Sequence, residues 1–384
     1  MNTPAVSEVL DALAGIKDSE SSQARSLPTG FYTSEEYLDL EKEEIFRKEW
    51  ICLGRVAEIP KPGDYFATEL IDEPLIVTRG QDMKVRVLSN VCRHRSSVIV
   101  EGKGRAKHFV CPYHAWTYAN DGQLLRAPYM DKVKGFDVTS CRLPEFETEL
   151  WHGFIYVNLD GKAKPLAPRL KGLEPYLQNR HLEDMVVSTV LDEVWPTNWK
   201  CLAENYMEGY HLNTLHSKAL YDITPTRLCE KLPSGEGYTG YKANYTSKTS
   251  STKDYHSDVT PAERRFSLYF WVFPSHAVSI TLNGSSSLCL QPRGVDELNN
   301  RCILSTYKPV TARKLAARLK SRGATMDEDR EQLERMRRGL KSRYVQPNSL
   351  GPANLEGTVW DLYQYAAQMM ISNKVSKTLP KGVF

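Results

Sequence analysis

Short runs in which hydrophobic and polar residues alternate dominate residues 51 to about 159. The run from Lys84 to Leu88 is one example, and turn signals such as Pro62-Gly63-Asp64 and Asp121-Gly122 lie between the runs. A period of two residues is typical of strands, and Gly, Pro and Asp are typical of the turns that join them. The pattern therefore predicts an all-β domain over residues 51–160.

From about residue 161 onward the pattern becomes mixed, which predicts an α+β domain over residues 161–384. Apolar runs at 266–280, 286–290 and 302–307 favour buried strands. Residues 311–344 are heavily charged, and we interpret them as a solvated surface helix. A last helix is expected from about Leu355.

The first 50 residues are expected to form an arm and a helix that pack with the second domain. Residues 5–16 have the spacing of a short amphipathic helix, and residues 17–30 are Ser-rich and then Pro-Gly, which predicts a mobile arm. Thr33-x-x-Glu36 is a capping-box pattern that predicts a helix reaching to about Trp50.

Composition excludes several classes of protein. The 384 residues are 41% hydrophobic and 25% charged with a net charge of +3, which is ordinary for a globular protein and too small for a nucleic-acid binder. Because there is no run of about 18 apolar residues and no signal-like N-terminus, we expect no membrane span and a cytoplasmic protein. Six of the eight cysteines are scattered and favour buried free thiols.

The other two cysteines belong to a repeated Cys/His pattern. Cys92-x-His94 and Cys111-x-x-His114 are separated by sixteen residues. Iron–sulfur clusters need thiolates, and in Rieske centres two histidines replace two cysteines on one iron. Zinc is the alternative, since two Cys and two His can also bind it tetrahedrally. Zinc motifs more often pair Cys with Cys and His with His, so one of each per loop favours the Rieske cluster.

A second pattern suits a single iron. His211 and His216 lie five residues apart, with Glu204 and Glu208 upstream. Two histidines and one carboxylate on one face are the ligands of many non-haem iron oxygenases. Asn198 is expected to begin a helix on which residues 204, 208 and 211 share a face. Taken alone, the pair could equally be two unrelated helical histidines.

Together, these segments resemble the Rieske non-haem iron oxygenases, a superfamily of ring-hydroxylating dioxygenases and carnitine monooxygenases. The block CPYHAWTY is specific to that family, which more often has glycine where this chain has Ala115. The resemblance extends to a pattern that matches Glu204, Asn205, Glu208, Tyr210, His211 and His216. It implies an α+β fold in which an all-β Rieske [2Fe-2S] domain accompanies a helix-grip catalytic domain with an antiparallel sheet.

The resemblance also implies roles for single residues. Cys92, His94, Cys111 and His114 would hold the cluster, and His211 and His216 would bind a mononuclear Fe(II). Asn205 and Glu208 would be catalytic. In the family, the carboxylate at position 208, usually an aspartate, links an iron-ligand histidine to a Rieske histidine of a neighbouring subunit. Glutamate there is typical of the carnitine monooxygenase branch.

The third iron ligand is expected near the C-terminus, where Glu356 and Asp361 are the candidates. Gly351-Pro352-Ala353 resembles the segment before that ligand in aromatic-ring dioxygenases, and the offsets of Trp360 and Gln364 favour Glu356. The remaining acid would then be an ordinary helix charge.

The resemblance implies a terminal oxygenase that uses dioxygen and electrons from NAD(P)H, delivered by a reductase with or without a separate ferredoxin. The expected assembly is a homotrimer or a multiple of one. We favour hydroxylation of an aromatic compound or aromatic acid. The alternative substrate is a quaternary ammonium compound such as a carnitine or betaine, and a Rieske electron carrier without oxygenase activity is an alternative of another class.

Two surfaces follow from this interpretation. A basic patch near the cluster loops could dock an acidic electron donor, or could consist of ordinary solvated charges. Its members are Arg93, Arg95, Lys103, Arg105 and Lys107. The candidates to line a substrate pocket are Asn205, Tyr206, Phe270, Trp271, Phe273 and Asn283.

Overall fold

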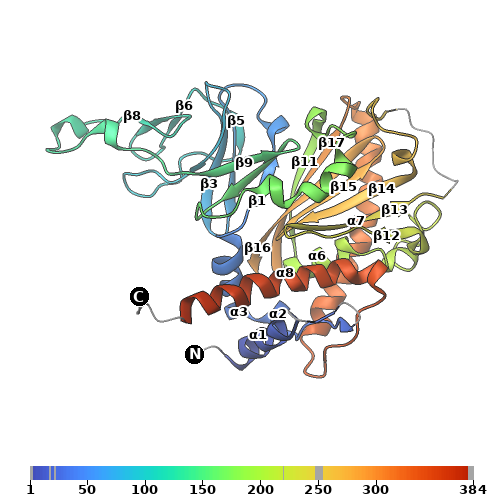
Figure 1. The fold of residues 1–384 in the computed structure, drawn as a ribbon. Coiled ribbons are helices and arrows are strands. Elements are labelled where there is room, and N and C mark those ends of the chain that lie inside the picture. Colours follow the sequence, from blue (N-terminus) through green and yellow to red (C-terminus); the bar gives the residue numbers. More distant parts are fainter. Residues whose placement is uncertain (1–2, 17–18, 21–22, 219, 247–253, 379–384) are drawn as a thin grey trace. The chain divides into compact units, whose positions relative to one another are not determined.

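The chain folds into two compact units, Trp50–Lys164 and Met1–Glu49 with Pro165–Phe384. Figure 1 shows this computed structural model, which describes residues 3–16, 19–20, 23–218, 220–246 and 254–378. Both units are built on antiparallel sheets, and the second adds helices. The predicted α+β fold with an all-β domain is therefore confirmed. No helix in the described ranges is both long and apolar enough to cross a membrane.

The smaller unit contains two sheets. One has the order β1-β10-β9-β4-β3-β2-β5, and the other is the three-stranded meander β6-β7-β8. Their bounds are β1 Ile51–Arg55, β2 Asp64–Leu70, β3 Glu73–Arg79, β4 Val85–Ser89, β5 Lys103–Arg105, β6 His108–Val110, β7 Thr117–Ala119, β8 Leu124–Arg126, β9 Glu145–Trp151 and β10 Phe154–Asn158. Phe109, Trp116 and Tyr118 are buried in one cluster with Cys92 and Cys111, so the core of this unit lies directly beneath the predicted ligand loops.

The larger unit contains a seven-stranded antiparallel sheet of order β11-β17-β16-β15-β14-β13-β12. Its strands are β11 Val186–Trp195, β12 Cys229–Lys231, β13 Tyr238–Asn244, β14 Phe266–Val272, β15 His276–Thr281, β16 Gly284–Gly294 and β17 Glu297–Thr306. One row of paired residues crosses five strands, because Tyr241, Tyr269, Ser279, Ser286 and Leu304 are successive register partners. Register partners lie on the same face of a sheet, so this row faces a single side.

Three helices contribute to the site. α6 (Trp199–Met207) contacts β13 to β16, α8 (Ala353–Thr378) contacts β12 and β13, and α7 (Ala312–Leu340) contacts α6. The ring centroids of Tyr206 on α6 and Tyr269 in the five-strand row are 6.0 Å apart, so this row faces α6. The remaining helices are short or N-terminal: α1 Pro4–Ile16, α2 Gly30–Thr33, α3 Glu35–Glu41, α4 Leu166–Arg169 and α5 Glu174–Leu177.

The N-terminal segment is tied to α6 by a buried ion pair. Lys200 Nζ lies 2.5 Å from Glu41 Oε2, and both side chains are buried. The rings of Phe31, Tyr37 and Trp199 lie 4.8, 5.5 and 5.1 Å from the ammonium nitrogen. A buried charge is tolerated only when it is paired in this way. The contact holds the helix that leads into the His211 region.

Two local predictions for the N-terminal segment need correction. The cap of α3 is Ser34, whose hydroxyl accepts from Tyr37 N at 3.2 Å, rather than the predicted Thr33. Residues 17–18 and 21–22 of the predicted mobile arm lie outside the described residues. The described part instead pairs with a distant segment, since Leu350 N donates to Ala24 O at 3.0 Å. Backbone pairing holds this stretch in place, contrary to the prediction.

Candidate functional site

The predicted cluster residues lie in two loops that have the same pattern of backbone hydrogen bonds. The backbone carbonyl of each cysteine, Cys92 or Cys111, accepts a hydrogen bond from the N–H of the residue four positions later. The backbone N–H of each cysteine donates to the carbonyl of the residue five positions later. The fourth residue after each cysteine, Ser96 or Ala115, has a positive φ of 54° or 57°. Only glycine adopts this region without strain, which explains the frequent glycine of related sequences where this chain has Ala115.

These loops bring the four predicted cluster ligands together. Cys92 and Cys111 are buried in the same cluster of side chains, and Cys92 Sγ lies 3.3 Å from Tyr118 Oη. His94 Nδ1 and His114 Nδ1 face each other at 3.1 Å. Two buried thiols beneath two converging imidazole nitrogens suit a [2Fe-2S] cluster with two Cys and two His ligands. The donor set therefore fits a Rieske cluster.

α6 ends earlier than predicted, and this ending shapes the second site. The helix stops at Met207, and Glu208 is extended with φ −114° and ψ 155°. The Glu208 carboxylate then accepts from the backbone N–H groups of Tyr210 and His211. It thereby caps the short 3-10 turn His211–Asn213. Residues 204, 208 and 211 do not share one helical face, and the prediction that they do is wrong.

Each iron-site histidine contacts one carboxylate through Nδ1. Glu208 Oε1 contacts His211 Nδ1, and Glu328 Oε2 lies 2.7 Å from His216 Nδ1. A carboxylate at this position fixes the tautomer and leaves the Nε2 lone pair for a metal. The two rings lie 5.1 Å apart between centroids and at 74° to each other. Sequence reasoning had identified Glu208 but not Glu328.

A third carboxylate completes the group, and it is Asp329 on α7. Ligand atoms of His211, His216 and Asp329 all lie within 4.8 Å of one another. Asp329 Oδ1 is 3.1 Å from His216 Nε2, and this buried oxygen has no other partner among the described residues. Buried polar atoms are rarely left without a partner. Two lone pairs facing each other at this distance fit a divalent metal ion between them.

The structure offers Asp329 in place of the predicted Glu356. Glu356 forms no such group with the two histidines in the described part of the chain. Its carboxylate instead accepts from Gly351 N, and burial raises its pKa. Asp361 pairs with Lys231 at 2.8 Å and accepts from Thr239 Oγ1 at 2.6 Å. Both acids therefore have other partners.

A cavity of about 670 Å³ adjoins this group and is rich in carboxylates. Its walls include Tyr32, Glu204, Asn205, Glu208, Glu356 and Tyr363. Glu204 is half-buried, and desolvation raises its pKa to about 7, although hydrogen bonds from Tyr32 and Tyr363 oppose the rise. Three carboxyl groups therefore lie in the wall beside His211, together with the positive charge of Arg335.

Most of the predicted pocket residues do not line this cavity. Phe270 and Trp271 are buried beside Tyr206 in the core between α6 and the sheet. Phe273 stacks on Tyr365 with centroids 4.6 Å apart. Asn283 is exposed at the turn between β15 and β16, and its prediction as a lining residue is wrong because the turn points it into solvent. Asn205 does line the cavity.

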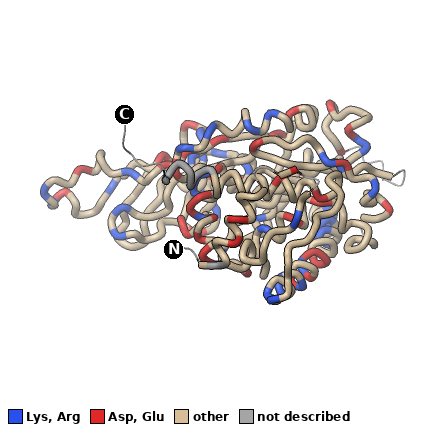
Figure 2. Tube along the Cα trace, turned by 60° about the horizontal axis from the view of Figure 1, so that its bottom comes forward, with Lys and Arg blue, Asp and Glu red and all other residues tan. Residues whose placement is uncertain are grey.

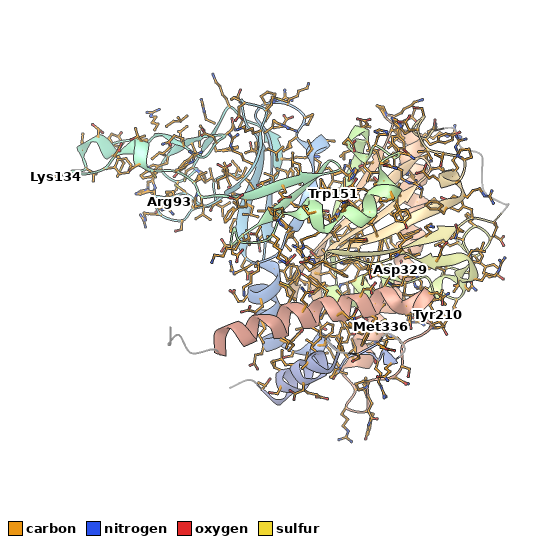
Figure 3. The ribbon with its side chains drawn as sticks, viewed as in Figure 1. Arg93, Lys134, Trp151, Tyr210, Asp329 and Met336 are labelled. Carbon is orange, nitrogen blue, oxygen red and sulfur yellow. The ribbon has the colours of Figure 1, made fainter. Side chains whose placement is uncertain are left out.

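The five residues of the predicted basic patch are all exposed. Arg105 pairs with Asp64 at 2.6 Å, and the Arg95 guanidinium lies 5.3 Å from the centre of the Tyr113 ring. Figure 2 shows basic and acidic positions interspersed along the chain. Arg93 of the basic patch and Asp329 of the candidate metal group are labelled in Figure 3.

Known proteins place these two sites in one family. Residues 49–137 match the Rieske [2Fe-2S] domain, and residues 178–372 match the ring hydroxylating alpha subunit (catalytic domain). The chain is 29% identical over 326 residues to the carnitine monooxygenase oxygenase subunit of Acinetobacter baumannii, covering 83% of this chain and 86% of that one. It is 35% identical over 230 residues to the glycine betaine monooxygenase oxygenase subunit of Chromohalobacter salexigens, covering 58% and 52% of the two chains.

A solved structure agrees with these relatives. A quaternary ammonium Rieske monooxygenase, described for carnitine oxidation by gut microbiota and inter-subunit electron transfer, has a TM-score of 0.82 and 26% identity. The match covers 91% of this chain and 97% of the solved one. The cluster loops, the histidine pair and both domain matches agree with one another. The chain belongs to the Rieske non-haem iron oxygenases as the alpha, or terminal oxygenase, subunit.

Proposed function

We propose that this oxygenase acts on a quaternary ammonium compound rather than on the aromatic compound favoured by the sequence alone. The observation that carries the proposal is the pair of half-buried rings of Tyr206 and Tyr269, which lie where α6 faces the sheet. Tyr206 lies against Tyr269 and Trp271 at 6.0 and 6.2 Å, and Tyr241 stacks on Tyr269 at 4.8 Å. Aromatic faces bind quaternary ammonium groups.

Two further observations support this substrate class. Tyr269 is close to Asp329, because burial and nearby charges that include Asp329 raise its pKa. The carboxyl groups of Glu204, Glu208 and Glu356 also line the adjoining cavity and outnumber the one arginine, Arg335, in its wall, which would favour a cation over an aromatic acid. Relatives described for carnitine and glycine betaine agree with this direction.

The proposed iron ligands are His211, His216 and Asp329. When bound, the iron supplies the activation of dioxygen, and the cluster supplies electrons received from a reductase. The chain's own residues hold the imidazoles in place: Glu208 fixes His211, and Glu328 fixes His216. Asn205 lines the cavity and would position what enters it.

The proposed assembly is a homotrimer in which Glu208 of one chain faces a cluster histidine, His94 or His114, of the next. The exposure of both cluster loops supports this, since His94 and His114 reach the surface of their unit. Tyr210, next to Glu208 in the chain, is 54% exposed and offers a surface for such a contact. The basic patch would dock an acidic electron donor.

Turnover with paired substrates tests the proposed function. The protein, reconstituted with iron and a compatible reductase, is offered carnitine, glycine betaine or naphthalene. We expect oxygen consumption coupled to product only with the trimethylammonium compounds. Naphthalene has no positive charge to interact with the carboxyl groups that line the cavity. Coupled turnover of naphthalene alone would overturn the proposal and restore the aromatic assignment. The Asp329→Ala protein is the matched control for uncoupled background.

A further inference from the structure

A second group of possible metal ligands lies in the larger unit, outside the candidate iron site. Ligand atoms of His181, His256 and Asp184 all lie within 4.8 Å of one another. The two imidazole rings are 4.1 Å apart between centroids and tilted by 34°. Imidazole and carboxylate ligands together suit zinc, whereas calcium and magnesium prefer oxygen ligands. None of these three residues belongs to the cluster loops or to the group around Asp329.

A short turn brings two of these side chains together. His181 adopts the left-handed conformation, with φ 40° and ψ 59°, and the 3-10 turn Leu182–Asp184 follows it. Asp184 N donates to His181 O at 3.1 Å. Side chains three residues apart in a 3-10 turn lie one above the other. The Asp184 carboxylate therefore returns to the same side as the His181 imidazole.

The segment that carries His256 is held against this turn by contacts outside the group. Asn179 Nδ2 donates to the Glu263 carboxylate at 3.2 Å, and Arg180 Nη2 donates to Glu263 O at 3.1 Å. Asn179 and Arg180 directly precede His181, and Glu263 follows His256 in the segment between β13 and β14. Because other bonds already bring the two halves of the group together, an ion would have less entropy to overcome on binding.

Asp258 faces one nitrogen of each ring. Its Oδ2 lies 2.8 Å from His181 Nε2 and 3.8 Å from His256 Nδ1. The other nitrogens face carboxylates of the turn. His181 Nδ1 is 3.9 Å from Glu183 Oε1, and His256 Nε2 is 4.0 Å from Asp184 Oδ2. In zinc sites an outer carboxylate commonly holds one imidazole nitrogen while the other binds the ion, so the arrangement leaves His181 Nδ1 and His256 Nε2 as ligands.

The separations suit a small ion. Around a zinc ion with ligands at about 2.0–2.1 Å, neighbouring ligand atoms lie about 3.3 Å apart. The 4.0 Å between His256 Nε2 and Asp184 Oδ2 is only slightly longer, and the Asp184 side chain, 62% exposed, can close it. Asp258 N donates to His256 Nδ1 at 3.3 Å. Binding of the ion at Nε2 would move the ring proton to Nδ1, where the Asp258 carboxylate would accept it.

We propose that His181, Asp184 and His256 bind a zinc ion, with Asp258 as the outer carboxylate that orients both imidazoles. Three protein ligands leave the fourth tetrahedral position to water. The ion joins the segment before β11 to the segment between β13 and β14. It stabilises the folded chain, because a ligand that binds only the folded state raises its stability. The site is separate from the iron and does not depend on which substrate is oxidised.

Zinc content after equilibrium dialysis tests the proposal. The iron-loaded protein, without an affinity tag, is dialysed against micromolar zinc chloride, and zinc and iron are measured in the same sample. We expect about one zinc per chain with the iron retained, and a higher Tm with zinc than without it. His256→Gln and Asp184→Asn should each weaken zinc binding at least about tenfold and abolish the rise in Tm. The cluster absorbance is the control for folding.

His108→Gln is the matched control, because His108 is exposed and belongs to no group of possible metal ligands in the described part of the chain. This variant should bind zinc as wild type does. Asp329→Ala should also keep the zinc, whereas zinc held in the iron site would be lost from it. Zinc bound equally by wild type, His256→Gln and Asp184→Asn, or not bound by wild type, would overturn the proposal. X-ray absorption that shows sulfur at about 2.3 Å from zinc would also overturn it, because the ion would then have replaced the cluster.

Discussion

The choice of the third iron ligand is decided at the scale of single side chains. Glu356 and Asp329 are both buried or half-buried acids near His211, but only Asp329 offers an oxygen without a donor beside His216 Nε2. Glu356 already accepts from the Gly351 backbone. A metal ion would give the Asp329 oxygen a partner. To bind Glu356, it would have to displace the Gly351 N–H from that carboxylate.

Iron content separates these two acids. Asp329→Ala should reduce the iron from about three to about two per chain, because the cluster keeps its two irons and the mononuclear site loses a ligand. Glu356→Gln should keep about three. Metal analysis measures the iron content. The visible absorbance of the cluster is the control for folding. The reverse pattern, with iron lost only from Glu356→Gln, would return the ligand role to Glu356.

Glu328 gives an intermediate case. Its carboxylate touches His216 Nδ1 and not the candidate metal position. Glu328→Gln should therefore keep the ligands but weaken iron binding about 10- to 100-fold, as outer-shell changes do.

At the scale of elements, three helices meet at one half-buried carboxyl group. Tyr32 of α2 donates to Glu204 of α6 at 2.7 Å, and Tyr32 Oη lies 3.0 Å from Tyr363 Oη of α8. Burial raises the pKa of Glu204 from 4.5 to about 7, so near neutral pH the group is partly protonated. The contact between these helices therefore depends on pH.

The direction of this dependence follows from linkage. A carboxyl group whose folded pKa is raised stabilises the fold below its unfolded value, 4.5, and this contribution is lost as the pH rises through about 7. The loss amounts to roughly 3 kcal/mol at most, since each pKa unit is worth about 1.4 kcal/mol. Glu204→Gln keeps the acceptor for Tyr32 and removes the titration. We therefore expect its Tm to gain on wild type between pH 5 and pH 8, and a constant difference in Tm across that range would contradict the role of Glu204.

Elements also show where sequence reasoning reached its limit. The end of α6 was placed too late because helix propensity runs past Met207, whereas the Glu208 carboxylate caps the next turn instead. Asp329 was missed because it lies in a run of charges assigned to a solvated helix. The available signal was helical spacing, since Asp329 and the buried Leu333 are four residues apart and share the inward face.

At the scale of the whole molecule, the sequence was sufficient for the reaction class and insufficient for the substrate. Cys92, His94, Cys111 and His114 could be identified because each metal-binding loop is a short local motif. The third ligand could not be identified in this way, because α7 reaches the site only through tertiary packing. Contacts between chains could not be predicted either, because neither a local motif nor a single chain contains them.

Electron transfer between chains can be tested by complementation. Cys111→Ser removes a cluster ligand, Asp329→Ala removes a proposed iron ligand, and each protein alone should be inactive. The two variants carry different tags and are co-expressed, so that oligomers containing both can be purified. If electrons pass from the cluster of one chain to the iron of its neighbour, every mixed trimer has one competent interface of three and should restore about a third of the activity.

Mixed oligomers should therefore be active although neither parent is, because the intact cluster and the intact iron site lie on adjacent subunits. Homo-oligomers of each variant, purified in the same way, are the controls for the cluster absorbance and iron content that each should retain. Inactive mixed oligomers with those contents intact would mean that both metals must lie in the same chain. In that case Glu208 would serve only to orient His211, and a trimer would not be required for catalysis.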